Sequence, residues 1–516
     1  MKNNNCVIII DFNSQYTMLI FKMLRQLKVY CEVYSYNDIS IDKIHNINPS
    51  GIILSGSSYS VLNNGPMLSD KIFNINIPIL GICYGMQLIV KMLGGVIENI
   101  IRCREFGLSR IIIKKYSNLT NNIYDRINSD GCIFLDVWMS HNDVVTKIPD
   151  NFIVIAGNDK CQNAIIANEK DKIYGLQFHP EVSHTKCGIN LIKRFVFNIC
   201  NCVPNWNISN INTAITSSIN HLVKSNDKVI LGLSGGIDSL VTAIIINNVI
   251  GRRLICIFID NGLLRLNEYK LVAKLSNDFN LNTIFINAKD KFFNALSNIS
   301  DAEEKRKIIG KVFMDVFLEQ ATNFNNVKWF AQGTIYSDII ESKNKIKSHH
   351  NVGGLPNNIG LKLLEPIKKL FKDEVRELGL KINVPYNVLY RYPFPGPGLA
   401  IRIIGEVKDN LCKLLRLADS IFIEELKNSN FYYRIDQAFT ILLPIKSVGI
   451  IGDCRRHDLV LALRAINTSN FMTAKWVKIP YNLLHKISSR IINEINEISR
   501  VVYDISDKPP STIEWE

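Results

Sequence analysis

The segment that most constrains the fold of this chain is Leu233-Ser-Gly-Gly-Ile-Asp-Ser239, near the middle of its 516 residues. It follows the apolar run 228–232 directly, and a stretch rich in Val, Ala and Ile continues from Asp238 to Ile250. This pattern predicts a buried strand, a turn of small residues and a helix. Small residues let backbone N–H groups approach an anion, and a helix N-terminus adds positive charge. The segment therefore predicts a phosphate-binding loop in an α/β domain.

The loop lacks the Gly-Lys-Ser/Thr of a Walker motif. Ser-Gly-Gly-x-Asp-Ser instead resembles the pyrophosphate loop of enzymes that split ATP into AMP and pyrophosphate. Asp238 is then a candidate ligand for Mg²⁺, an ion that prefers oxygen. The alternative interpretation is a glycine-rich turn in an ordinary α/β sheet. The ATP-binding residues that the resemblance implies are Ser234, Gly235, Gly236, Ile237, Asp238, Ser239 and Leu240.

A second motif, Pro78-Ile-Leu-Gly-Ile-Cys-Tyr-Gly-Met-Gln87, places a cysteine between two glycines at the end of an expected strand. An apolar helix is expected to follow from Met86 to Leu93. Glycine two residues before and after a nucleophile permits the sharp turn of a nucleophile elbow. Such a turn puts the thiol of Cys83 at a helix N-terminus, which favours the thiolate.

A thiolate nucleophile needs a base, and Tyr174-Gly-Leu-Gln-Phe-His-Pro-Glu181 offers one. It reads as a strand ending in His179, with Glu181 two residues further and able to orient the imidazole. Cys83, His179 and Glu181 therefore form a candidate catalytic triad. Taken alone, Cys83 would more often be a buried core thiol.

Gly-Ile-Cys-Tyr-Gly-Met-Gln and Phe-His-Pro-Glu together resemble the class I glutamine amidotransferases, which release ammonia from glutamine. Such a domain ahead of a pyrophosphate loop resembles the family of glutamine-hydrolysing GMP synthetases. Further matching segments lie at 260–265, 304–310, 331–336, 347–354, 392–398 and 508–516, so the resemblance covers nearly the whole chain.

The resemblance implies three α/β domains. Residues 1–200 would be a flavodoxin-like class I amidotransferase domain, and 201–391 a doubly wound adenine-nucleotide hydrolase-like ATP pyrophosphatase domain. Residues 392–516 would be a small α+β domain that forms a homodimer and completes the site for xanthosine monophosphate (XMP). The implied reaction uses glutamine as the ammonia source and Mg²⁺-ATP to adenylylate the C2 oxygen of XMP. Ammonia then displaces AMP to give GMP.

The oxyanion of glutamine hydrolysis needs two backbone donors. The N–H of Tyr84, just after the nucleophile, is one candidate, and Ser57 in the turn Leu54-Ser-Gly-Ser-Ser58 is the other. The family usually has Ser-Gly-Gly-Pro there, so Ser57 stands where a glycine is common. A positive φ at Ser57 would cost about 1 kcal/mol or more, and loss of one donor slows such steps by roughly 10²–10³.

Two further groups of residues follow from the resemblance. A lid over ATP would carry carboxylates for metal and cations for phosphate; a solvated polar loop is the alternative. The lid residues are Asp338, Glu341, Lys347, His349 and His350, and the XMP-binding residues are Arg306, Lys508 and Glu514.

Composition and charge argue against several other classes of protein. No apolar run reaches the length of a membrane span, and the start lacks the apolar core of a signal peptide. The 12 cysteines form no CxxC pair and no zinc-type spacing, which favours a reduced, cytoplasmic protein. The net charge of +13 is dispersed, so we expect neither a nucleic-acid nor a membrane partner. A pyrophosphate-loop ligase or tRNA-modifying enzyme with another acceptor, and a basic RNA-binding protein on a degenerate enzyme scaffold, remain as alternatives.

The hydrophobic pattern also predicts individual elements. Residues 6–200 should form a mostly parallel sheet covered by helices, and 200–209 a linker. Strands are expected at 7–11, 51–54, 228–233, 254–259, 282–287, 327–332, 437–443, 446–452 and 459–466, and helices at 15–28, 408–427 and 481–499.

Overall fold

The computed structural model describes residues 5–343, 361–451, 454–468 and 473–516, with the side chains of 340–343, 451 and 454 left aside. The chain divides into two compact units, Met1–Asn210 and Ile211–Glu516. Residues 201–207, near the end of the first unit, have no regular structure, which agrees with most of the linker predicted at 200–209, although a helix begins at Ile208.

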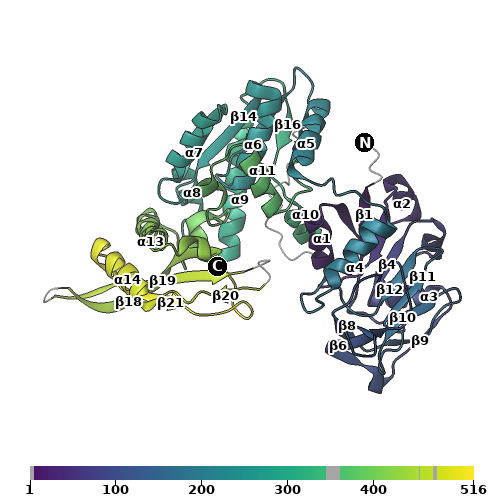
Figure 1. Ribbon diagram of the computed structural model, residues 1–516. Helices are drawn as coiled ribbons and strands as arrows, with labels where there is room; N and C mark the ends of the chain where they lie inside the picture. Colours follow the sequence, from purple (N-terminus) through teal and green to yellow (C-terminus); the bar gives the residue numbers. More distant parts are fainter. Residues whose placement is uncertain (1–4, 344–360, 452–453, 469–472) are drawn as a thin grey trace. The chain divides into compact units, whose positions relative to one another are not determined.

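The first unit is built on a ten-stranded sheet whose two halves differ in direction (Figure 1). One half is parallel and contains β2 (Tyr30–Ser35), β1 (Cys6–Asp11), β3 (Gly51–Leu54), β4 (Ile79–Ile82) and β12 (Ile173–Leu176). The other half is antiparallel and contains β11 (Ile165–Asn168), β10 (Ile153–Gly157), β6 (Glu105–Ile113), β8 (Ile133–His141) and β7 (Arg126–Ile127). The sheet is therefore mixed, and the prediction of a mostly parallel sheet was wrong for its second half.

Strands β1, β3 and β4 form the core of this unit because they are almost continuous runs of buried apolar residues, mostly Ile, Val and Leu. The accompanying helices are α1 (Thr17–Gln26), α2 (Ile41–Ile47), α3 (Tyr84–Met92) and α4 (Gly188–Arg194), and β5 (Val96–Glu98) pairs with β9 (Val144–Lys147) as a separate ribbon. Helix α1 confirms the predicted helix at 15–28 in shortened form.

The second unit begins with a five-stranded parallel sheet in the order β15-β14-β13-β16-β17. The strands are β13 (Lys228–Gly232), β14 (Leu254–Asp260), β15 (Thr283–Asn287), β16 (Val327–Ala331) and β17 (Lys362–Leu364). Strand order reverses direction at β13, as in a doubly wound fold, and ligands of such folds bind beyond the carboxyl ends of the strands at this point. The loop that starts at Leu233 lies there.

The helices of this part confirm the alternation of strands and helices. They are α5 (Ile208–Leu222), α6 (Ile237–Ile250), α7 (Glu268–Asp278), α8 (Lys289–Ala295), α9 (Ala302–Ala321), α10 (Tyr336–Lys343), α11 (Lys372–Lys381) and α12 (Tyr386–Leu389). Helix α6 is buried on nearly all sides, since Val, Ala and Ile occupy every face of it.

The C-terminal part of the second unit is a small, mostly antiparallel sheet with α13 (Asp409–Asn428) and α14 (Tyr481–Glu494) packed on it (Figure 1). Its strands are β18 (Gln437–Ile451), β19 (Cys454–Asn467), β20 (Lys475–Trp476) and β21 (Ile498–Asp504), and β21 pairs with β19 in parallel. One apolar core runs from β13 and β14 through α9 into α13 and α14.

Two predicted elements of this part were wrong in detail. The strands expected at 437–443 and 446–452 are one strand, β18, whose register shifts between Leu443 and Lys446. The helix expected to end at 499 ends at Glu494, and β21 follows.

Candidate active sites for glutamine hydrolysis and ATP cleavage

The turn that carries Cys83 is a sharp backbone elbow between β4 and α3. Cys83 has φ 50° and ψ −103°, a conformation that L-residues rarely adopt. A Cβ on Gly81 would lie 2.6 Å from the carbonyl carbon of Gly85, and a Cβ on Gly85 would lie 2.4 Å from the carbonyl oxygen of Leu54. Only glycine fits at both positions, which explains the spacing found in the sequence.

The structure brings the three predicted triad residues together. The Nδ1 atom of His179 lies 2.7 Å from Oε1 of Glu181, and the imidazole also hydrogen-bonds to Cys83. All three side chains are buried. Burial lowers the pKa of His179, but its hydrogen bonds to Cys83 and Glu181 and their negative charges raise it, and the net pKa is about 11. The geometry favours a proton on His179 beside the sulfur of Cys83.

The strand expected to end at His179 in fact ends earlier, at Leu176. His179 is held in the irregular segment that follows, where its backbone N–H donates to the carbonyl of Trp138 at 3.0 Å. The ring of Tyr16 contacts the imidazole edge-on, with ring centroids 5.0 Å apart.

A buried amide that the sequence analysis missed also touches the nucleophile. Nε2 of Gln177 lies 3.8 Å from Sγ of Cys83, within reach of a sulfur hydrogen bond. Gln87 fixes this amide by donating to its oxygen at 3.3 Å and to the carbonyl of Asp143 at 2.9 Å. Gln177 and Gln87 lie inside the motifs that carry His179 and Cys83, so their position in the sequence was the available signal.

The turn 54–58 lies beside the triad, but Gly56 is its closest residue. A Cβ on Gly56 would lie 3.0 Å from Cε1 of His179 and 3.9 Å from Cβ of Cys83. Ser57 does not belong to the positive-φ residues of the described chain, so the expected strain at this residue is absent. The Ser57 hydroxyl donates to the carbonyl of Phe12 at 2.7 Å and accepts from the N–H of Tyr59 at 3.1 Å.

In the second unit, the predicted ATP loop joins β13 to α6. Gly235 has φ 80°, and the two serine hydroxyls, of Ser234 and Ser239, lie 3.0 Å apart. The hydroxyl of Ser239 also donates to the carbonyl of Gly236 at 3.0 Å. The first N–H groups of α6 have no intrahelical acceptor, as at every helix N-terminus, and can therefore bind phosphate.

Charged side chains surround this loop. Lys372 forms an ion pair of 2.6 Å with Oδ2 of Asp238, and Oδ1 of Asp238 is buried without a hydrogen-bond partner. Arg391 donates to the carbonyl of Gly235 and pairs with Glu268 at 2.7 Å. The sequence analysis missed Lys372 and Arg391, because each comes from a distant segment. The unpartnered oxygen of Asp238 fits a Mg²⁺ ligand.

The predicted lid and XMP residues are only partly described. Asp338 lies in α10 and accepts the N–H of Ile335 at 3.0 Å, whereas the side chain of Glu341 and residues Lys347, His349 and His350 lie outside the described part.

Arg306 contacts the C-terminal tail, and Glu514 is part of this tail. Arg306 donates to the carbonyl of Glu516 and to Glu303 at 2.7 Å. Glu514 is held by the buried Arg402 at 2.9 Å. Lys508 pairs through its backbone with Ala474. A cavity of about 640 Å³ lies beside this tail, lined by residues 502–506, 510–512 and 515.

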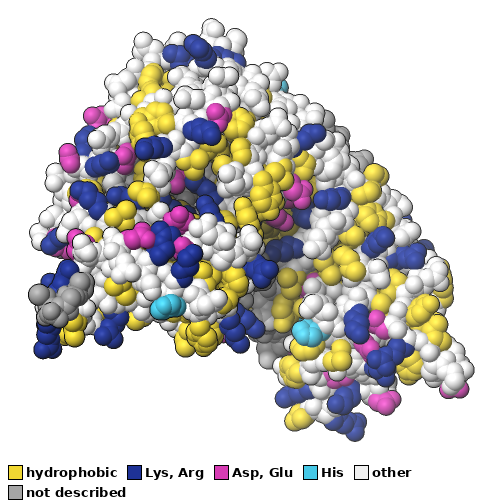
Figure 2. All heavy atoms as spheres, turned by 60° about the vertical axis from the view of Figure 1, so that its left-hand side comes forward, with side chains coloured by type: hydrophobic (Ala, Val, Ile, Leu, Met, Phe, Trp, Pro, Cys, Tyr) yellow, Lys and Arg dark blue, Asp and Glu magenta, His cyan; other side chains and the backbone are white. Residues whose placement is uncertain are grey.

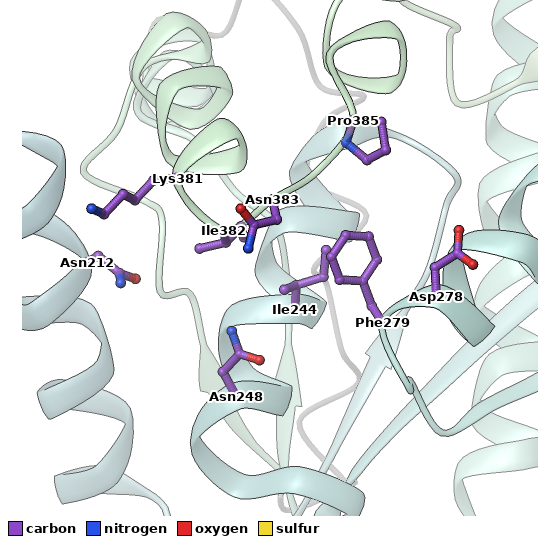
Figure 3. Close-up of a pocket in the computed structure, with 9 residues that line it drawn as sticks. All are labelled: Asn212, Ile244, Asn248, Asp278, Phe279, Lys381, Ile382, Asn383 and Pro385. Carbon is purple, nitrogen blue, oxygen red and sulfur yellow. The ribbon is translucent and has the colours of Figure 1, made fainter.

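A larger cavity, of about 700 Å³, lies away from the ATP loop (Figure 3). It is formed where α6, α7 and α11 approach their C-terminal ends, and amide side chains and Lys381 line it. It contains no residue of the predicted sites.

Comparisons with known proteins agree with this arrangement. The family model for class I glutamine amidotransferases matches residues 8–199, that for NAD synthase residues 208–325, and that for the GMP synthase C terminal domain residues 424–515. The chain thus joins a class I amidotransferase to an ATP pyrophosphatase of the NAD synthase type.

Two curated relatives carry the same printed name, "GMP synthase [glutamine-hydrolyzing]". One is from Yersinia pestis (strain Pestoides F) and the other from Yersinia pseudotuberculosis serotype O:3 (strain YPIII). Each is 52% identical over 521 residues, which covers 99% of this chain and 98% of the relative. The chain belongs to the family of glutamine-hydrolysing GMP synthases, as the sequence resemblance predicted.

Proposed function

We propose that this chain makes GMP from XMP, with glutamine as nitrogen donor and ATP as the activating substrate. The family membership carries this proposal, and the contact of Cys83, His179 and Glu181 supports its first step. An acceptor other than XMP is not favoured, because the similarity extends through the C-terminal domain of GMP synthases.

In the proposed glutamine hydrolysis, the sulfur of Cys83 attacks the side-chain amide carbon. His179 delivers its proton to the leaving ammonia and then takes a proton from the water that releases glutamate. Glu181 holds the imidazole in position through Nδ1. The N–H of Tyr84 and one N–H of the turn at Gly56 and Ser57 stabilise the oxyanion. Gln177 donates to the thiolate.

In the proposed synthetase step, the loop 234–240 holds the phosphates of ATP, and Lys372 and Arg391 add positive charge beside it. The C2 oxygen of XMP attacks the α-phosphorus and pyrophosphate leaves, giving adenylyl-XMP. Ammonia then attacks C2 and AMP departs. Mg²⁺, when bound, neutralises phosphate charge, and Asp238 would be its ligand. Arg306, Lys508 and Glu514 remain the proposed XMP residues, and Asp338 with 341–350 the proposed lid.

We also propose that the protein works as a cytoplasmic homodimer of three-domain chains, divided at residues 200 and 391. Exposed apolar side chains on β18 support a partner surface in the C-terminal part: Ile445 is 54% exposed and Ile450 75% exposed.

No helix within the described ranges is long and apolar enough to cross a bilayer. On the face drawn in Figure 2, Lys and Arg side chains are scattered among acidic and apolar ones. Sedimentation of the full chain tests the dimer, and a monomer at micromolar concentration would contradict it.

The test of the function is GMP formation from XMP and Mg²⁺-ATP, measured with glutamine and with ammonium. The wild-type chain should use both donors, whereas Cys83→Ala should use only ammonium. Formation of GMP from neither donor by the folded chain would overturn the substrate assignment. Equal glutamine use by Cys83→Ala would overturn the nucleophile.

A further inference from the structure

A second cluster of buried reactive side chains lies in the antiparallel half of the first unit. Glu105 is the first residue of β6, and His141, its register partner, is the last residue of β8. Cys161 lies in the turn between β10 and β11. One donor atom from each residue lies within 4.8 Å of the other two, and all three residues are buried.

The polar atoms that face each other in this cluster have no hydrogen-bond partners. Both ring nitrogens of His141 and Oε2 of Glu105 are buried and make no hydrogen bond, and Nε2 and Oε2 face each other at an ion-pair distance of 3.8 Å. His141 as a residue is only 4% exposed. Buried polar atoms in folded proteins are nearly always paired. A cation between Nε2 and Oε2 would satisfy both atoms at once.

The other atoms of the cluster are held by hydrogen bonds of the kind that orient metal ligands. Oε1 of Glu105 accepts from Ser109 at 2.8 Å and from Asn158 at 3.2 Å. The side-chain oxygen of Asn158 in turn accepts the N–H of Cys161 at 2.6 Å. Asn158 therefore ties two of the three ligand-bearing segments together, as outer-shell residues of metal sites do.

We propose that Glu105, His141 and Cys161 bind a zinc ion. An imidazole nitrogen, a carboxylate oxygen and a thiolate sulfur are the three donor types that zinc accepts in proteins, and a fourth position would remain for water. Thiolate ligation argues against magnesium and calcium, which prefer oxygen alone. The ligands come from three separate segments, so sequence spacing gave no sign of the site.

Zinc binding here has a chemical cost and a structural consequence. Burial raises the pKa of the Cys161 thiol, so the apo protein holds this proton at neutral pH. Zinc binding releases it to solvent as the Zn–S bond forms. The residue before His141 is Ser140, whose carbonyl lies 3.6 Å from Sγ of Cys83. A zinc ion at His141 would thus fix the end of β8 beside the nucleophile.

The test uses the full chain carrying Cys83→Ala, which removes the catalytic thiol as a competing ligand. Zinc titrated into the chelator-treated protein should bind with one equivalent per chain and raise the thermal midpoint. Cobalt, a spectroscopic substitute, should give thiolate-to-cobalt charge-transfer absorption in the near ultraviolet. No stoichiometric binding at micromolar zinc and no such absorption would overturn the proposal.

Added variants assign the binding to the three residues. Cys161→Ser should remove the charge-transfer absorption, whereas Cys31→Ser, at another buried cysteine of the same unit, should leave it unchanged. Asn158→Ala should weaken binding by about 10–100-fold. Charge-transfer absorption that survives Cys161→Ser would overturn the site. If Cys161→Ser does not fold, His141→Gln in the same Cys83→Ala chain decides, because retained one-equivalent binding would overturn the site.

Discussion

The two proposed reaction sites of this chain differ in how their side chains are arranged. In the first unit, His179 contacts Cys83 and Glu181, and Gln177 reaches the sulfur. In the second unit, the side chains of the ATP loop bond to each other, and Asp238 pairs with Lys372. A triad acts through side chains that packing can fix in advance. A phosphate loop acts largely through backbone N–H groups and takes its charge partners from the ligand.

The largest effect is expected from a substitution of Glu181, which should impair the first reaction site and leave the second unchanged. Glu181→Gln should lower glutamine-dependent GMP formation by about 10³–10⁴-fold, because the imidazole loses the carboxylate that orients and charges it. Ammonium-dependent formation should stay unchanged, since the second unit does not use Glu181. Parallel assays with both donors measure this, and an equal loss with both donors would contradict the separation.

The same substitution, Glu181→Gln, should also change how the stability of the protein depends on pH. The folded pKa of His179, about 11, lies above its ordinary value of 6.5. Its contribution to stability is therefore fully present below pH 6.5 and is lost as the pH rises toward 11. Glu181→Gln removes one cause of the increase, so the contribution should be smaller and its loss should be complete at a lower pH. The difference between the thermal midpoints of the two proteins should therefore shrink as the pH rises from 6 to 10; parallel profiles would contradict the assignment.

A smaller effect is expected from a substitution in the ATP loop. The loss of GMP formation should be the same with glutamine and with ammonium as nitrogen donor. Asp238→Asn should slow GMP formation by roughly 10²–10³-fold with glutamine and with ammonium alike, because an electrostatic group at the phosphates is lost. Raised Mg²⁺ should restore part of the rate. Lys372→Met is the matched variant, since it frees Asp238 from its ion pair. A loss confined to glutamine would place Asp238 outside the synthetase step.

A substitution of Gln177 tests whether its contact with the sulfur of Cys83 contributes to glutamine hydrolysis. A hydrogen bond to a charged group contributes about 1.5–3 kcal/mol, so Gln177→Leu should reduce glutamine-dependent turnover by about 10–100-fold. Alkylation of Cys83 by iodoacetamide should slow in parallel at pH 7, because the thiolate loses a donor. Unchanged alkylation would show that Gln177 acts on packing alone.

The two sites also differ in what could be predicted from sequence. The triad and the ATP loop were both predicted, since each is a short motif at the end of an apolar strand. Lys372 and Arg391 were missed because they reach the loop from distant segments, and local pattern carries no long-range contact. The cluster of Glu105, His141 and Cys161 was missed for the same reason.

Errors in the fold have local physical causes. Helix α14 was predicted too long because Ile487, Ile491, Ile495 and Ile498 are all buried and keep helical spacing past the true end at Glu494. Strand β18 was divided in two because Pro444 cannot donate to a sheet, yet a register shift there accommodates it.

The smallest effect is expected at Ser57, where a positive φ would have been costly and the structure has none. Ser57→Gly should change glutamine-dependent turnover by less than about threefold, because the N–H remains and φ needs no glycine. Gly56→Ala, one residue earlier, should reduce the same rate by roughly 10²–10³-fold, because its Cβ would press on His179 at 3.0 Å and shift the oxyanion donors. Steady-state glutaminase rates for both variants decide the order. A large gain in Ser57→Gly would instead mean that turnover requires a positive φ at this residue, which the turn would have to adopt during the reaction.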